Sequence, residues 1–217
     1  MRTEMRILKC ASKGKVNCCL PETEVESIAS ELKAGKLVVY PTETLYGLGA
    51  NAFDESAVKR VFVIKKRPFD MPLSVAVSGV EMLESVAVLD KTSRKLVQNL
   101  MPGPITLIIT KKPNVPDIVT SGSDEVGIRM PDHPLALQII RRVGPITSTS
   151  ANLHSKPDPT TVASMVKEFG DAINTYIDCG KTKLGKPSTI VAVHDGEIEI
   201  IRSGVVTKKE IEAALNG

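Results

Sequence analysis

The dipeptide Asp195-Gly196 constrains the fold more than any other feature of this sequence. It lies between two short β-type runs, residues 189–193 and 197–201. Asp-Gly favours a two-residue hairpin turn, because both central positions of that turn need a positive φ. The last two strands are therefore predicted to pair antiparallel, which argues against a purely parallel, doubly wound sheet.

The rest of the chain alternates between strand and helix patterns. Further strands are predicted at residues 36–40, 73–77, 105–110, 126–130 and 146–149. Helices are predicted at residues 92–100, 135–142 and 161–169, and after three N-terminal caps: Asp54 and the capping boxes at residues 23–26 and 207–210. The sequence thus indicates a mixed α/β fold.

The length and composition are those of a globular protein. The chain has 217 residues and no stretch that resembles a linker, so we expect a single domain over residues 1–217. Its apolar runs are shorter than a membrane span, and residues 1–15 lack a signal-peptide pattern. We therefore expect a cytoplasmic protein that does not enter a membrane.

The cysteines do not form a metal-binding or redox motif in the sequence. Cys10, Cys18, Cys19 and Cys179 have no CxxC spacing, and the histidines lie far from them along the chain. This pattern favours reduced thiols over a zinc site.

Charge and aromatic content bear on nucleic-acid binding. The net charge is +3, which is weak evidence for a polyanionic partner. The chain has four Phe, three Tyr and no Trp, so few rings can stack on bases. Any contact with RNA is expected to be mainly electrostatic.

The common nucleotide-binding motifs fit poorly. Gly180-Lys181-Thr182 resembles the end of a phosphate-binding P-loop, but Thr175 stands where that motif needs glycine. Residues 47–52 match a loose GxGxxA pattern, yet the acidic residue at the right distance, Asp70, lies in a loop flanked by prolines. No GxSxG or HExxH motif is present. What remains are short polar and cationic loops after apolar strands, which suit phosphates and a small zwitterion.

Residues 40–49, YPTETLYGLG, resemble the signature loop of the YrdC-like family of threonylcarbamoyl-AMP synthases. The resemblance continues in the family's order, from about residue 23 to the end, through residues 65–68, 72–73, 102–106, 129–134, 149–152, 187–190 and 201–204. It implies the YrdC-like fold, a twisted open sheet of mixed parallel and antiparallel strands with flanking helices and a large concave, positively charged cleft. The chain resembles the short, single-domain form of the family.

The resemblance also implies an activity. Members of the family make threonylcarbamoyl-adenylate and pyrophosphate from L-threonine, bicarbonate and ATP, and are therefore nucleotidyltransferases. The chemistry of ATP implies magnesium bridging its phosphates. The adenylate then passes to a separate transferase complex, which uses it for the threonylcarbamoyladenosine modification of tRNA. Phosphoryl-transfer chemistry of this kind needs positioning and fixed positive charge more than a protein nucleophile.

The family's ligands map onto nine residues of this chain. For the nucleotide they are the KxR pair Lys65 and Arg67, which are also the candidate catalytic residues, the SxN pair Ser150 and Asn152, and Arg202. For threonine they are Thr44, Arg129, Ser148 and Ser188, with Arg129 as the partner of the substrate carboxylate. Five of the nine have an ordinary structural alternative: Lys65 and Arg67 as a favourable helix end, Thr44 and Ser188 as turn or capping residues, and Arg129 as a surface charge.

The chain departs from the family pattern at three positions. Met71 and Ala76 stand where many members have Asn and His, so those ligands are missing or replaced. Asp158 stands where a hydroxyl contacts phosphate, and a carboxylate would repel that group. His154 is a candidate for compensating this change, or it points to solvent.

Two rival functions stay open on the sequence. One is a non-catalytic protein that binds double-stranded RNA or tRNA through its basic clusters, at residues 65–67, at residues 141–142, and at Lys181, Lys183 and Lys186. The other is a related carbamoyl-handling enzyme with another acceptor, which the changes at Met71 and Ala76 favour.

Overall fold

Most strands form one large mixed sheet. The computed structural model describes residues 5–12, 18–156 and 161–216. Within them the strands are β1 Arg6–Lys9, β2 Ala11–Ser12, β3 Cys18–Cys19, β4 Val38–Tyr40, β5 Gly47–Gly49, β6 Ser74–Ala76, β7 Ile105–Thr110, β8 Glu125–Arg129, β9 Ile146–Ser150, β10 Thr175–Asp178, β11 Thr189–His194 and β12 Glu197–Arg202. Ten of these strands make a sheet in the order β1-β10-β4-β5-β9-β6-β8-β7-β11-β12, and β2 pairs with β3 alone.

The sheet combines both kinds of pairing, as predicted. β1, β10 and β4 are parallel, as are β6 with β8 and β7 with β11, whereas the other neighbours are antiparallel. Asp195 and Gly196 join β11 to β12 with φ values of 50° and 85°. This is the hairpin turn expected for Asp-Gly, and the prediction of a mixed open sheet is confirmed.

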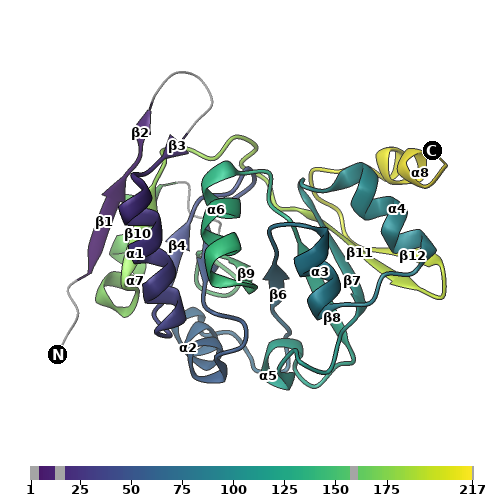
Figure 1. The fold of residues 1–217 in the computed structure, drawn as a ribbon, viewed down its shortest axis with the longest axis horizontal. Coiled ribbons are helices and arrows are strands. Elements are labelled where there is room, and N and C mark those ends of the chain that lie inside the picture. The colour runs from purple at the N-terminus through teal and green to yellow at the C-terminus, as the bar shows by residue number, and fades with distance from the viewer. Residues whose placement is uncertain (1–4, 13–17, 157–160, 217) are drawn as a thin grey trace.

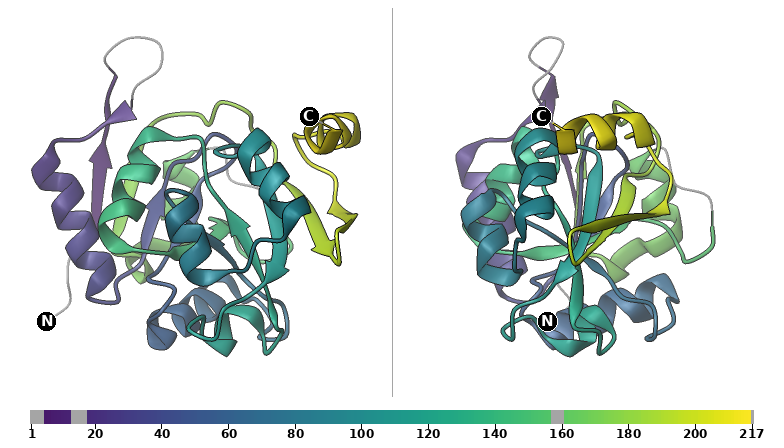
Figure 2. Two further views of the ribbon diagram at one scale, coloured as in Figure 1. Left: turned by 45° about the vertical axis from the view of Figure 1, so that its right-hand side comes forward. Right: turned by 90° about the vertical axis from the view of Figure 1, so that its right-hand side faces the viewer.

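Helices flank the sheet. They are α1 Glu22–Lys33, α2 Glu55–Lys65, α3 Val80–Val86, α4 Lys91–Leu100, α5 Asp117–Thr120, α6 Pro134–Val143, α7 Val162–Phe169 and α8 Lys208–Asn216, with a short 3₁₀ helix at Gly170–Ala172. α8 lies beside α4, at the end of the molecule opposite β1 (Figures 1 and 2). No helix of the described residues has the length and apolar character needed to span a bilayer.

The predicted helix caps are partly confirmed. Asp54 accepts a hydrogen bond from the backbone N–H of Ala57 at 3.0 Å and starts α2. Thr207 and Glu210 cap each other reciprocally at the start of α8. The capping box predicted at Thr23 is wrong, because α1 already begins at Glu22 after Pro21 and has no side-chain cap.

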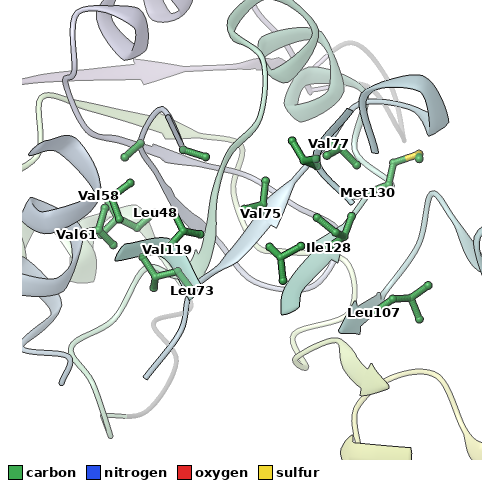
Figure 3. Packing of buried hydrophobic residues seen from close by; sticks show 14 of the residues in the cluster. Leu48, Val58, Val61, Leu73, Val75, Val77, Leu107, Val119, Ile128 and Met130 are labelled. Carbon is green, nitrogen blue, oxygen red and sulfur yellow. The ribbon is translucent and has the colours of Figure 1, made fainter. Parts of the chain in front are cut away.

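One face of the sheet packs into the larger apolar core. Leu48, Val75 and Ile128 lie on this face and are 1% exposed or less. Val58 and Val61 of α2 belong to the same core, and Figure 3 shows them next to Leu48. Burial of these side chains supplies the main driving force for folding.

The opposite face is covered by helices only in part. Ala76 and Ile146 face a second apolar cluster that contains Ile28 of α1 and Ile139 and Ile140 of α6. α1 and α6 lie side by side over this part of the sheet (Figure 1). Beyond them, the same face carries small and polar residues.

The cysteines differ from the expectation. Cys10 and Cys179 are disulfide-bonded, so the prediction of reduced thiols is wrong for these two residues. Cys10 follows β1 and Cys179 follows β10, and these two strands are parallel neighbours. Sheet pairing therefore brings together two cysteines that are far apart in the sequence.

Ile128 faces the apolar core and Ile201 is exposed, so replacing these two residues should affect the stability of the fold to different extents. Ile128→Ala should lower the free energy of unfolding by about 2 to 5 kcal/mol, because it leaves a cavity in the core. Ile201→Ala, in a strand position that is 51% exposed, should cost no more than about 1 kcal/mol. Urea unfolding of both variants measures this, and equal losses would contradict the assignment of the core face.

Candidate functional site

Small residues line the uncovered face in the middle of the sheet. Ser150 of β9 pairs with Gly47 of β5, and Ser148 pairs with Ser74 of β6. Ser74 in turn pairs with Gly127 of β8. Residues directly opposite each other point to the same side of a sheet. A Cβ atom added at Gly127 would lie 2.7 Å from the Ser74 hydroxyl oxygen, so this row has room only for small side chains.

The KxR lysine and the SxN pair meet at one edge of this face. Lys65 ends α2 and is 2% exposed. Its ammonium group donates to the backbone oxygens of Ser150 and Asn152, the latter at 2.6 Å, and to Asn152 Oδ1 at 3.3 Å. Ser150 Oγ donates to the same Oδ1 at 2.6 Å. Lys65 therefore holds residues 150–152, the SxN turn, in place and puts a positive charge next to their backbone oxygens.

Arg67 lies in the loop that follows α2. Its guanidinium donates to the backbone oxygens of Met71 at 3.0 Å and Pro72 at 2.9 Å. Partial burial lowers the pKa of this side chain. Met71 thus contributes a backbone carbonyl at the position where many family members have Asn, and its own side chain is exposed.

Arg129 and Thr44 meet in a buried polar cluster. Arg129 ends β8 and is 9% exposed, so the alternative that it is a surface charge is wrong. Its Nη2 donates to Thr44 Oγ1, to Glu43 Oε1 at 3.0 Å and to Thr42 Oγ1 at 3.3 Å. Glu43 and Thr42 were not predicted as site residues, although both stand inside the signature loop. An acidic side chain between two threonines in that loop was the signal that could have found Glu43.

Ser188 and Arg202 form a third group. The Arg202 guanidinium donates to the Ser188 backbone oxygen at 2.8 Å and to its hydroxyl at 3.2 Å. Ser188 Oγ lies 2.9 Å from Thr106 Oγ1. Ser188 therefore contacts both Arg202, which is predicted to bind the nucleotide, and Thr106 of β7, the strand beside the one that Arg129 ends.

The strand register connects these groups. Arg129 stands two residues after Gly127 on β8, and therefore on the same face. Leu107 pairs with Ile128, which places Thr106 opposite Arg129. Ile190 of β11 pairs with both Thr106 and Arg202. The three groups thus follow one face from β9 to β12.

Ser148 is the last of the nine predicted ligands, and Ala76, His154 and Asp158 are the positions at or near the departures from the family pattern. Ser148 hydrogen-bonds the Tyr40 hydroxyl, whose pKa is raised by burial. Ala76 is buried under the α6 helix and offers no ligand. The backbone N–H of His154 donates to the Lys65 oxygen at 2.7 Å. Asp158 lies outside the described residues.

The segment between β10 and β11, residues 179–188, is fastened to the signature loop. The backbone N–H groups of Leu184 and Gly185 donate to the oxygens of Glu43 and Thr44. Tyr46 donates its hydroxyl hydrogen to the Gly180 oxygen at 2.7 Å. The segment therefore crosses the same loop that holds Arg129.

A cavity of about 560 Å³ lies elsewhere, between α4 and α8. Asn99, Pro102 and Glu210 are among its lining residues, which include none of the nine predicted ligands. The expected concave cleft at the ligands is therefore not this cavity.

Fold and site together define an α/β protein with cations, hydroxyls and a carboxylate collected on one face of a mixed sheet. Residues 30–204 match the Sua5/YciO/YrdC family, which carries the description "Telomere recombination". The chain belongs to this family.

Several known proteins are similar over most of the chain. A putative threonylcarbamoyl-AMP synthase of Methanocaldococcus jannaschii is 42% identical over 84% of this chain and 86% of its own length. A threonylcarbamoyl-AMP synthase of Pyrococcus abyssi is 39% identical over 90% of this chain, which spans 58% of that relative. The structure of P. abyssi Sua5 complexed with L-threonine superposes with a TM-score of 0.90 at 37% identity, and covers 97% of this chain and 61% of its own.

The contacts of Lys65 predict a structural effect that is separate from activity. Lys65→Met should lower the free energy of unfolding by about 1.5 to 3 kcal/mol, because it leaves the oxygens of part-buried Ser150 and buried Asn152 without a charged donor. The neighbouring Lys66→Met, at an exposed position, should change it by less than about 0.5 kcal/mol. Thermal and urea unfolding measure both. If Lys65→Met is as stable as the wild type, Lys65 does not hold the SxN turn.

Proposed function

We propose that this protein is a threonylcarbamoyl-AMP synthase, a nucleotidyltransferase that makes threonylcarbamoyl-adenylate and pyrophosphate from L-threonine, bicarbonate and ATP. The observation that carries the proposal is the meeting of Lys65 with Ser150 and Asn152 on the sheet face that also holds Arg129. The names of the M. jannaschii and P. abyssi relatives support it. The product would serve the threonylcarbamoyladenosine modification of tRNA.

The reaction has two bond-forming steps. The threonine amine and bicarbonate form a carbamate and release water. A carbamate oxygen then attacks the α-phosphorus of ATP, and pyrophosphate leaves. Negative charge gathers around that phosphorus, so the protein's task is to place the reactants and to oppose the charge with fixed donors.

The cationic residues suit the nucleotide. Arg67 offers a planar guanidinium two residues after Lys65, and Lys65 supplies positive charge at the SxN turn itself. The Ser150 hydroxyl and the Asn152 amide permit close approach of phosphate oxygens. Arg202 would hold the nucleotide at the other end of the face, where it already contacts Ser188.

The hydroxyl-rich residues suit threonine. Arg129 is the partner for its carboxylate, and the Thr44 hydroxyl beside it fixes the guanidinium. Ser148 and Ser188 offer hydroxyls on the same face to the rest of the amino acid. The complex of P. abyssi Sua5 with L-threonine supports threonine as the amino acid that this family fold accepts.

Magnesium would come with ATP as part of the substrate. The described residues contain no group of three or more His, Cys, Asp or Glu side chains arranged to hold a metal ion. The triphosphate would therefore supply most of the oxygen ligands of the ion.

The setting of the enzyme is also a proposal. We propose that residues 1–217 act as one domain in the cytoplasm and pass the adenylate to a separate tRNA transferase complex. Direct handover suits this product, since a mixed anhydride is readily hydrolysed by water.

The proposed reaction predicts an activity and its loss. With ATP, magnesium, bicarbonate and threonine, the protein should release pyrophosphate and form the adenylate, detected by mass. Arg67→Ala should slow this by roughly 100-fold or more, because a donor for the developing charge is lost. Arg141→Ala, an exposed arginine on α6, is the matched control and should keep full activity.

Two results would count against this assignment. Pyrophosphate release that does not depend on threonine would favour a related enzyme with another acceptor. Full activity of Arg67→Ala would remove the arginine from the proposed nucleotide site.

Direct contact with tRNA is a second proposal, carried by the segment over the signature loop. Lys181, Lys183 and Lys186 lie on that segment, and all three are exposed. Changing the three to Gln should weaken tRNA binding and lower the salt dependence of the affinity by a slope of roughly 1 per lysine. Filter binding at several salt concentrations measures this. A wild-type protein with no affinity for tRNA at low salt would refute it.

A further inference from the structure

The Glu43 carboxylate is buried in the loop between β4 and β5, and none of the roles above uses it. Glu43 is 4% exposed. A buried carboxylate is destabilising unless its oxygens are paired. Oε1 accepts a hydrogen bond from Arg129 Nη2, whereas Oε2 is buried without a hydrogen-bond partner among the described residues.

Arg129 is half-paired in the same way. Its Nη2 contacts Thr42, Glu43 and Thr44, while its Nε, also buried, has no partner in the described part of the chain. Two touching side chains therefore leave one acceptor and one donor unused. Few buried polar atoms stay unpaired in native proteins, and a bound ligand is one reason for those that do.

An amino acid carries on one carbon atom the two groups that this pair lacks. Its carboxylate accepts from a guanidinium N–H, and its ammonium group donates to a carboxylate oxygen. We infer that Glu43 binds the ammonium group of the amino-acid substrate through Oε2 while Arg129 binds the carboxylate. This inference rests on the proposed function, which supplies threonine as the amino acid.

The cluster fixes the geometry of such a site. Thr42 and Thr44 accept from Arg129 Nη2, so the guanidinium is held beside Glu43 before any substrate arrives. Both unpaired atoms are closed to solvent, so entry of the amino acid requires local movement. Leu184 and Gly185 donate backbone hydrogen bonds to this loop at Glu43 and Thr44, and lifting them would break two such bonds.

A role in binding the amine differs from a role in neutralising Arg129. If Glu43 only neutralised Arg129, its replacement would change the affinity for every carboxylate ligand alike. If Glu43 binds the ammonium group, its replacement changes only the affinity for ligands that carry an amine. L-threonine and its amine-free analogue, 2,3-dihydroxybutanoate of the same configuration, separate the two cases.

The experiment measures the affinities of the full-length protein for both compounds by calorimetry. The wild type should prefer threonine, and Glu43→Gln should weaken threonine binding by roughly 10- to 100-fold while the analogue changes little. In the activity assay, KM for threonine should rise more than kcat falls. Glu43→Asp, which keeps the charge, should restore part of the preference, and Glu81→Gln on α3, at an exposed position, is the matched control.

Each outcome decides the inference. An equal loss for both compounds, or no loss in a folded Glu43→Gln, overturns it. The wild type gives a test that does not depend on a folded variant, because equal affinity for threonine and the analogue also overturns it. If threonine binding depends on Glu43 but no adenylate forms, the proposed function falls and the amine site stands. If adenylate forms and Glu43→Gln binds threonine normally, only the amine site falls.

Discussion

In the central strands β9, β6 and β8, one face carries Thr147, Val75 and Ile128, and the other carries Ser148, Ser74 and Gly127. The first face is sealed in the core, which fixes the register, since a slip by one residue would exchange the two sets. The second face then presents hydroxyls and bare backbone over several neighbouring strands. Apolar packing on one side of the sheet thus decides where the polar chemistry on the other side lies.

Two buried cations contact the strands and loops around that polar face. Lys65 and Arg129 are both less than a tenth exposed, and each is held by oxygen atoms from segments far from it in sequence. Their positions depend on the tertiary fold because their partners do. Both cations are therefore held in place by the protein's own oxygen atoms.

Much of the fold was predictable from local patterns. The β-type run at residues 105–110 and the Asp195-Gly196 turn predicted β7 and the β11–β12 hairpin. β5 was missed because Gly47 and Gly49 give it no strand propensity, and only pairing with β4 and β9 makes it a strand. The cap predicted at Thr23 failed because local capping patterns do not fix where a helix begins.

The sequence motifs select candidate ligands, whose binding roles stay predictions, but they do not show the contacts among them. The motifs named Lys65, Ser150 and Asn152, yet no local pattern shows that the lysine binds the backbone of the SxN turn. Glu43 was missed because its partner, Arg129, stands 86 positions further along the chain. The disulfide-bonded state of Cys10 and Cys179 likewise follows from strand neighbours that spacing rules do not reveal.

The way the middle of the segment 179–188 docks on the signature loop leaves the Lys183 side chain open to change. Cys179 and Gly180 contact Tyr46, and Leu184 and Gly185 contact the loop backbone, in every case through main-chain atoms of the segment. Lys183 is exposed between these anchor points. A fluorophore attached there would leave the docking contacts intact and would turn each departure of the segment from the loop into an optical signal.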